Sequence, residues 1–257
     1  MKSVTRSLRV LEAVARHQPV TLGELTKIFG LPKSTVQRTL VTLNEAGWLR
    51  ANRKDTTRWE IGARVLAVRP AALQGSSLFA AAREPMIRLR DALNETIHLS
   101  VPDALHGMVV VDRVDCDHAV RTFHAIGDTS PLHATAAGNA VLAHLGKSEI
   151  DEVTAGTLEG YGEETITDPG QLRAELHRVR ERGYAVNHNQ YLQGVCAIAA
   201  PVLDGEGTPL AAVAVSLPDS RFEPGRLPEL GRLVAETAAE ITARHLPDAG
   251  PGGSVRG

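Results

Sequence analysis

The sequence predicts a two-domain protein of the α+β class. A small helical domain with a β-hairpin comes first, and a larger domain built on one mostly antiparallel sheet follows. Residues 5–47 contain three apolar runs at helical spacing, and two short strand-like runs follow in residues 48–61. From residue 96 onward, strand-like segments stand at both ends of a region with helical pattern. The expected boundaries are 1–65 for the first domain, 66–94 for a helical linker that includes the first helix of the second domain, 95–246 for the second domain, and 247–257 for a disordered tail.

The first predicted helix has a single apolar stripe whose members lie three or four positions apart. Thr5 is its expected N-cap, and Pro19 should end it shortly after residue 17. The stripe consists of Leu8, Leu11, Val14 and Ala15.

The second predicted helix has a recognisable signal at each end. Thr21 and Glu24 form a T-x-x-E capping box, in which each side chain accepts a hydrogen bond from the other residue's backbone. Gly30 is the expected C-terminal glycine, and Pro32 is well placed in the first turn of the next helix. The turn between the second and third helices is therefore very short.

The third predicted helix is followed by a hairpin. Its apolar side repeats at Val36, Leu40 and Leu43, and it should stop at Gly47. Two short strands, residues 48–51 and 58–61, flank a polar tip. The order helix, helix, helix, hairpin is that of a winged helix-turn-helix.

The second domain is predicted to alternate between strands and helices. An antiparallel sheet is expected because strands at both ends of the domain enclose the helices. The expected strands are 97–101, 107–114, 120–124, 195–203 and 210–217, and the expected helices are 135–145, 148–155, 171–182 and 225–245.

Composition indicates a globular protein of a reducing compartment. Hydrophobic residues make up 43% of the chain, which excludes a disordered protein, and Cys116 and Cys196 are too few for a disulfide framework. Glu12 and Arg16 interrupt the segment where a signal peptide would have its apolar core. The longest apolar stretch, residues 209–218, is too short for a membrane-spanning helix. We therefore expect a soluble, cytoplasmic protein without membrane contact.

Charge is distributed unevenly between the two predicted domains. Residues 1–65 contain 12 basic and 5 acidic residues, a net charge of +7, whereas the remainder has 16 basic and 25 acidic residues, a net charge of −9. A basic end on an acidic body is typical of a module that binds a polyanion, although chance clustering of surface charge gives the same count.

The predicted third helix has the two faces that a DNA-recognition helix requires. Its start can bind phosphate, and Gln37 and Arg38 lie one turn further in, where side chains reach base edges. Arg53, Lys54 and Arg58 would place a basic wing against the DNA backbone or minor groove. A three-helix protein-interaction module with a solvated charged face is the alternative. The full set of predicted DNA contacts is Thr21, Lys33, Ser34, Thr35, Gln37, Arg38, Arg53, Lys54 and Arg58.

Motifs along nearly the whole chain, from about residue 3 to 246, resemble the isocitrate-lyase-regulator (IclR-type) family of bacterial transcription regulators. The resemblance implies a GAF-like α/β-sandwich effector domain, dimers through the N-terminal half, and dimers of dimers through the effector domains. It also implies an effector that is a small organic acid or an aromatic catabolite, and double-stranded operator DNA as the partner. The motifs are SLRVL at 7–11, GLPKSTVQR at 30–38, WEIG at 59–62, PLHATAAG at 131–138, RGYAV at 182–186 and IAAPV at 198–202.

The resemblance also implies an effector pocket, and this chain departs from the family there. The family often has an acidic residue at Asn187, Cys at Ala197, Ser at Ala214 and Lys or Arg at Asn139. Fewer polar groups would favour an effector less polar than the smallest oxo-acids. From the residues alone, the loop and helix start at 131–138 could hold a carboxylate, or its small residues could simply allow close packing. The pocket residues implied are Thr122, Ala136, Ala137, Asn187, Ala197, Ala214 and Ser216.

Other chemistries are weakly supported. Residues 115–118 contain metal-ligand types but lack a second half, so neither a metal nor a cofactor is expected. Cys196 at the start of an apolar strand is an expected inert core thiol, and His133 is more typical of packing than of catalysis. No nucleophile elbow, zinc-protease helix or phosphate-binding loop is present, so an enzyme is not expected. The remaining alternatives are a GAF-like enzyme and an architectural DNA-binding protein without an effector.

Overall fold

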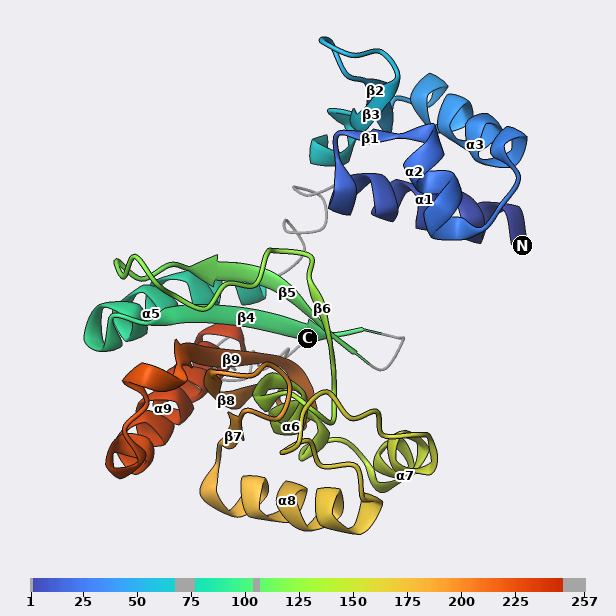
Figure 1. Cartoon of the computed structure of the whole chain (residues 1–257). Coiled ribbons are helices and arrows are strands. Elements are labelled where there is room, and N and C mark those ends of the chain that lie inside the picture. The colour runs from blue at the N-terminus through green and yellow to red at the C-terminus, as the bar shows by residue number, and fades with distance from the viewer. Residues whose placement is uncertain (1, 68–76, 104–106, 247–257) are drawn as a thin grey trace, which may run out of the picture. The chain divides into compact units, whose positions relative to one another are not determined.

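The chain divides into two units, residues 1–76 and 77–257, in the computed structural model. The structure describes residues 2–67, 77–103 and 107–246. The predicted tail at 247–257 and residues 68–76 of the predicted linker lie outside the described residues. The elements of the first unit (Figure 1) are α1 (Lys2–His17), β1 (Val20–Thr21), α2 (Leu22–Phe29), α3 (Lys33–Glu45), β2 (Leu49–Ala51) and β3 (Arg58–Ile61).

The first unit is a winged helix-turn-helix, as predicted. Gly30 adopts a left-handed conformation with φ of 60° and ends α2, which brings α3 in after a short turn. Leu25 of α2 and Leu40 of α3 are fully buried in the shared core. A third strand, β1, pairs with β3 and extends the hairpin to a three-stranded sheet. The sequence did not predict β1, which has only two residues.

The start and the buried face of α1 differ from the prediction. The helix begins at Lys2, so Thr5 lies inside it and is not its N-cap. Val10 and Val14 are fully buried, whereas Leu8 is 54% exposed. The helix therefore turns a face centred on Val10 and Val14 to the core, rather than a stripe that includes Leu8.

The second unit is built on a six-stranded sheet in the order β6-β5-β4-β9-β8-β7, and every neighbouring pair is antiparallel. This architecture agrees with the expected α/β sandwich. Its strands are β4 (Thr96–Pro102), β5 (Gly107–Val114), β6 (Thr129–Pro131), β7 (Ala185–His188), β8 (Val195–Leu203) and β9 (Pro209–Pro218). Its helices are α5 (Ser77–Leu93), α6 (Ala136–Leu142), α7 (Lys147–Ala155), α8 (Pro169–Arg182) and α9 (Leu227–His245), with short 3-10 turns at Asp219–Arg221 and Pro224–Arg226.

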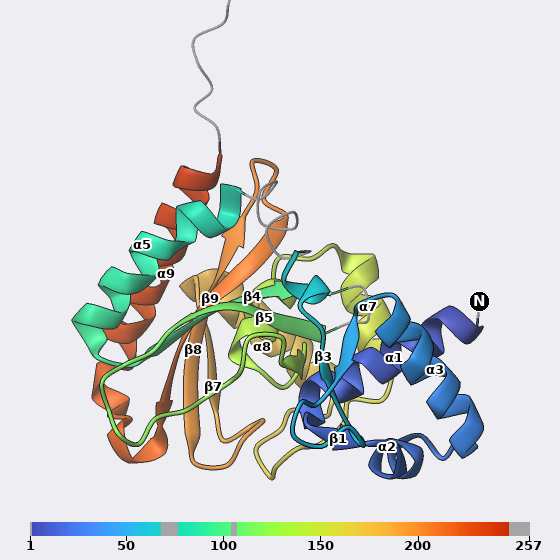
Figure 2. The same cartoon turned by 90° about the horizontal axis from the view of Figure 1, so that it is seen from above.

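Helices cover both faces of this sheet (Figures 1 and 2). On one face, α5 and α9 pack on large aliphatic residues such as Ile97, Leu99 and Val213. On the other face, α6 and α8 pack on small residues such as Ala199 and Ala214. Because helices cover both faces of the sheet, side chains on both faces of β8 and β9 are buried. This explains why these two strands are long, continuous apolar runs.

The prediction of a strand at 120–124 is wrong. These residues form no strand, and β5 instead pairs at the sheet edge with β6, which the sequence did not predict. Two carbonyl groups of this segment accept hydrogen bonds from side chains distant in the sequence. Arg113 Nη1 donates to the carbonyl oxygen of His124 at 2.7 Å, and Arg221 Nη1 donates to that of Val120 at 2.9 Å. Side-chain donors thus occupy acceptors that a strand ladder would use.

Candidate functional site

Helix α3 presents a polar face opposite its buried residues. Lys33, Gln37 and Arg38 are exposed, whereas Val36 and Leu40 are fully buried. Among the described residues, neither Lys33 nor Arg38 forms an ion pair. Both cations are therefore available to an external anion.

A groove lined by hydroxyls and arginines runs between α1 and α3. Arg38 lies in it together with Arg6 of α1, which the sequence prediction missed. Ser3, Arg6 and Ser7 share one face of α1 by their helical spacing, and this spacing was the available signal. Hydroxyl and guanidinium groups are the side chains that most often contact nucleic-acid phosphates. The groove is lined by Ser3, Arg6, Ser7, Ser34, Thr35, Arg38, Thr39 and Thr42.

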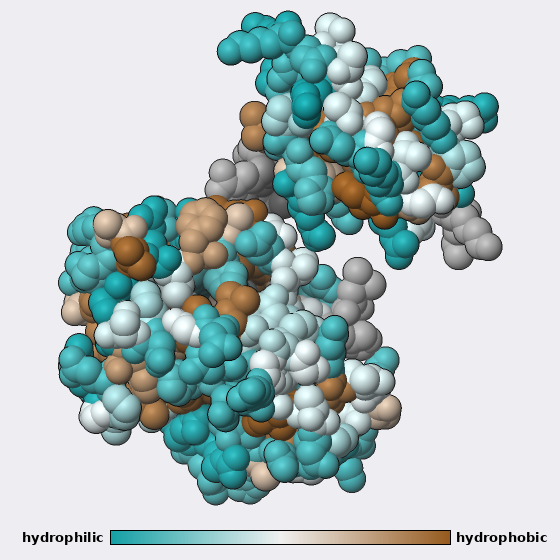
Figure 3. All heavy atoms as spheres, viewed as in Figure 1, coloured by the Kyte–Doolittle hydropathy of each residue, from teal (hydrophilic) through white to brown (hydrophobic). Residues whose placement is uncertain are grey.

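The wing carries exposed cations on a tip that is closed by an asparagine. Asn52 Oδ1 accepts hydrogen bonds from the backbone N–H groups of Lys54 at 2.8 Å and Asp55 at 3.0 Å. Arg53 and Lys54 are exposed and, among the described residues, form no ion pair. Hydrophilic residues cover this tip, at the upper edge of the first unit in Figure 3.

Two predicted DNA contacts, Arg58 and Thr21, have partners inside the first unit. Arg58 Nη1 donates to the carbonyl oxygen of Pro19 at 2.9 Å, and Arg58 Nε lies 3.3 Å from Asp55 Oδ2. Thr21 and Glu24 form the predicted capping box, and the hydrogen bonds from the Thr21 backbone and hydroxyl lower the pKa of Glu24. Both side chains thus help to fix the hairpin and α2 in place.

A cavity in the second unit lies between the α6 face of the sheet and the start of α6. The cavity opens to solvent, and the empty space in and in front of it amounts to about 620 Å³. Strand β4 supplies His98 and Ser100, and other strands of the sheet supply further residues. The start of α6 and the segments that contain His124 and Tyr191 supply the remaining walls. Its lining residues are His98, Ser100, Val110, His124, Asp128, Thr129, Ser130, Thr135, Ala136, Ala137, Asn187, Tyr191, Leu192, Val195, Ala197, Ala214 and Ser216.

Six of the seven predicted pocket residues line this cavity: Ala136, Ala137, Asn187, Ala197, Ala214 and Ser216. The sheet register brings three of them together, because Asn187 pairs with Ala197 and Ala197 pairs with Ser216. Thr122 is not a lining residue; its hydroxyl oxygen is buried without a hydrogen-bond partner among the described residues.

The α6 wall is fixed to the loop that precedes it. Thr135 caps α6, since its hydroxyl oxygen accepts a hydrogen bond from Gly138 N at 3.1 Å and donates one to the carbonyl oxygen of Pro131 at 2.9 Å. A Cβ atom on Gly138 would lie only 2.1 Å from the carbonyl oxygen of Leu132. The glycine therefore serves close packing, whereas Ala136 and Ala137 line the cavity.

Asn187 connects the sheet to the same loop. Its side-chain Nδ2 donates to the carbonyl oxygen of Ala134, and it lies 3.4 Å from Gln190 Oε1. Asn187 is 4% exposed. The amide therefore positions the loop before α6 against β7, at the edge of the cavity.

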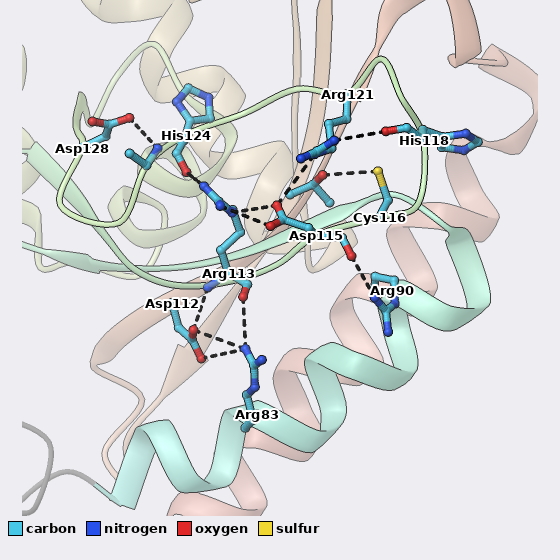
Figure 4. Close-up of polar contacts among 12 residues, drawn as sticks. Arg83, Arg90, Asp112, Arg113, Asp115, Cys116, His118, Arg121, His124 and Asp128 are labelled. Carbon is cyan, nitrogen blue, oxygen red and sulfur yellow. Dashed lines mark hydrogen bonds and ion pairs between the residues drawn. The ribbon is translucent and has the colours of Figure 1, made fainter.

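Segment 115–128 forms another wall and is held by Arg113 (Figure 4). Besides its hydrogen bond to the His124 carbonyl oxygen, Arg113 has its Nε 2.8 Å from Asp115 Oδ1, and its guanidinium lies 4.0 Å from the centre of the Phe123 ring. These contacts place His124 at the cavity. The sequence prediction missed this role of Arg113, because the residues it joins are separated along the chain.

Two imidazoles meet inside the cavity. The rings of His98 and His124 lie 5.5 Å apart in an edge-on arrangement with an interplanar angle of 72°. Burial, followed by the nearby His124 and Arg113, lowers the pKa of His98 to about 3. Burial also lowers the pKa of His124. Both rings are therefore uncharged near neutral pH.

Cys196 and His133, the other reactive side chains singled out in the sequence, are both buried. Cys196 is fully buried, and burial raises the pKa of its thiol to about 12. His133 Nε2 lies 2.9 Å from the carbonyl oxygen of Glu159, in a packed position. In the described part of the chain, no cluster of three metal-ligating side chains occurs, and no helix is long and apolar enough to cross a membrane.

Two family models together match most of the chain. Residues 3–53 match the IclR helix-turn-helix domain, and residues 70–243 match the bacterial transcriptional regulator IclR C-terminal domain. The transcriptional repressor IclR of Escherichia coli strain K12 is 33% identical over 245 residues, which are 94% of this chain and 89% of that protein.

Solved structures match the same architecture. The crystal structure of an IclR-type transcriptional regulator from Alicyclobacillus acidocaldarius has a TM-score of 0.84 at 23% identity and covers 95% of this chain and 99% of its own. At that identity the likeness concerns the fold alone. The structure of an IclR homologue from Microbacterium hydrocarbonoxydans, complexed with 4-hydroxybenzoate, has a TM-score of 0.79 at 25% identity and covers 94% of this chain and 98% of its own.

Proposed function

Because this chain belongs to the IclR family of bacterial transcriptional regulators, we propose that it represses a metabolic or catabolic operon and that a small acid bound in its second unit controls repression. The family consists of transcriptional regulators and not of enzymes. The observation that carries the proposal is that one chain combines a recognition helix bearing unpaired cations with a separate, largely uncharged cavity.

The DNA contacts are proposed to divide into two kinds. Gln37 and Arg38 read base edges, because they are exposed one turn into α3. Phosphate contacts come from the start of α3 at Lys33, Ser34 and Thr35, from the wing at Arg53 and Lys54, and from Arg6 across the groove. Thr21 and Arg58 act by holding α2 and the wing in position.

The second unit is proposed to bind a small organic or aromatic acid. The support is a cavity whose lining combines apolar residues, such as Val110, Val195 and Leu192, with polar side chains. A relative binds 4-hydroxybenzoate, which is an acid of this class. Alanine at 197 and 214 also keeps this lining less polar than the family pattern that the sequence resembles.

The assembly is proposed to be a symmetric dimer, or a dimer of dimers, on palindromic half-sites. A two-fold operator matches a two-fold protein, because each recognition helix then meets an equivalent half-site. Effector binding changes DNA affinity only if the effector binds the DNA-bound and free states with different affinity.

The test is fluorescence anisotropy of the full-length protein on promoter DNA flanking its own gene, at several salt concentrations and with a panel of aliphatic and aromatic acids. Binding should be specific and salt-dependent, and one acid should weaken it. Arg38→Ala should weaken specific binding about 10- to 100-fold. Arg16→Ala, an exposed arginine in the last turn of α1 and outside the groove, is the matched control. Binding that ignores every acid would favour an architectural protein instead.

A further inference from the structure

Val41 is an apolar side chain on the polar face of α3. The structure describes α3 along its whole length, and Val41, which is 40% exposed, is the one apolar residue among the exposed positions of this helix. It follows Gln37 by four positions and Arg38 by three, so it adjoins both on the helix surface. A single exposed aliphatic residue is common on protein surfaces, and exposure alone therefore assigns no role. The place of Val41 beside the two residues proposed to read bases is what singles it out.

The groove between α1 and α3 indicates which side of this polar face meets phosphates. The residues of α3 that line the groove all carry a hydroxyl or guanidinium group; they are Ser34, Thr35, Arg38, Thr39 and Thr42. Gln37 and Val41 do not line the groove, so they lie on the flank of α3 that turns away from α1. When a phosphate strand occupies the groove, that flank faces the base pairs of the adjoining major groove. Val41 is thus placed for contact with a base and not with the backbone.

We propose that Val41 recognises the C5 methyl group of a thymine, which makes it a specificity-determining residue for operator DNA. This inference rests on the proposed binding of operator DNA by α3. A valine side chain forms no hydrogen bond, and the thymine methyl is the apolar group that the major groove presents. Contact between the two removes apolar surface of both from water, which favours thymine over a base without that methyl. Valine is a poorer helix former than alanine, so helix stability does not explain its presence at this exposed position.

Exchange of thymine for deoxyuridine tests the contact without any mutation, because deoxyuridine lacks only the C5 methyl group and keeps the groups that form the base pair. The probe is promoter DNA flanking the protein's own gene, prepared once with thymine and once with deoxyuridine. Binding of the full-length protein to both duplexes is measured by fluorescence anisotropy. The deoxyuridine duplex should bind about 3- to 10-fold more weakly for each methyl group contacted. Replacement of one thymine at a time should place the loss at equivalent positions of the two half-sites.

Variants then assign the thymine preference to Val41. Val41→Ala should bind thymine DNA about 3- to 10-fold more weakly than the wild-type protein and should bind both duplexes with about equal affinity. Val41→Thr should keep part of the preference, because threonine retains one of the two γ-methyl groups. Thr42→Ala is the matched control, because Thr42 is the adjacent exposed residue but lines the groove. Its preference for thymine over deoxyuridine should equal that of the wild-type protein, whatever its affinity for DNA.

The outcomes separate this inference from the proposed function. Specific binding with equal affinity for both duplexes would mean that no thymine methyl is recognised, so the role of Val41 would be wrong while operator binding stands. A thymine preference that persists in Val41→Ala would assign the methyl contact to another residue and refute the role of Val41. Absence of specific binding to either duplex would contradict both the inference and the proposed function.

Discussion

Gly138→Ala should destabilise the second unit, although alanine is the better helix former. Alanine within a helix gains about 1 kcal/mol over glycine. The added Cβ, however, would lie 2.1 Å from the carbonyl oxygen of Leu132 and 2.5 Å from its Cα, where ordinary contact begins at 3.4 Å. The neighbours are backbone atoms that cannot rotate away, so α6 or the loop must move by more than an ångström. Overpacking of this severity costs about 3 kcal/mol.

The net expectation is a loss of about 2 kcal/mol in the free energy of unfolding, which lowers the melting temperature of a domain of this size by about 4 to 8 °C. The two units can be followed separately, because both tryptophans, Trp48 and Trp59, lie in the first unit and all three tyrosines lie in the second. Near-ultraviolet circular dichroism from tyrosine should shift, whereas tryptophan fluorescence should not.

Gly225→Ala is the matched control, because a Cβ at that position meets no atom within 4 Å. Effector binding by Gly138→Ala should also weaken, since moving α6 displaces Ala136 and Ala137 from the cavity wall. A Gly138→Ala protein that melts at or above the wild-type temperature would refute the reasoning, because helix propensity would then outweigh the clash.

Three further predictions concern stability and reactivity. Thr21→Val removes the acceptor for Glu24 N and should destabilise the first unit by about 1 kcal/mol, measured by tryptophan fluorescence in urea; an unchanged midpoint would mean that the cap contributes nothing. The pKa of Glu24 is lowered from 4.5 in the folded state, so its contribution to stability is present above about pH 4.5 and is lost as pH falls through the folded pKa. Glu24→Gln should therefore reduce the acid sensitivity of the first unit, and an identical pH profile would contradict this. Cys116 and Cys196 are both buried, so a thiol reagent should label neither until the protein unfolds, and rapid labelling of the native protein would disprove their burial.

Local signals in the sequence predicted the first unit well. The capping box at Thr21 and Glu24 and the left-handed Gly30 are determined by neighbours in the chain, so their chemistry is readable in a short window. Strand β1 was missed because two residues carry no periodicity, and its pairing partner β3 lies far along the chain. The start of α1 was misplaced because Thr5 is an ordinary N-cap residue type that here lies within a longer helix.

The cavity was only partly predictable. Resemblance to the family identified six lining residues. All six lie on a helix or on strands, where motifs of the family can be aligned with this sequence without gaps. His98, His124 and Tyr191 were not identified as lining residues. His124 reaches the cavity through a segment that was expected to be a strand, and it does so because Arg113 holds the His124 carbonyl oxygen. Such side-chain-to-backbone contacts leave no periodic signal in the sequence.

The position of the cavity follows from an alternation of side-chain size along the sheet. In β4 and β9, the residues facing α5 and α9 are large and aliphatic, such as Leu99 and Val213, whereas those facing α6 are small or polar, such as Ala214 and Ser216. Large side chains fill their layer at close-packed density. Small side chains leave volume, which α6 and α8 fill except where α6 begins. The strands thus determine where space remains, and the segments containing His124 and Tyr191 help to determine which molecule fits it.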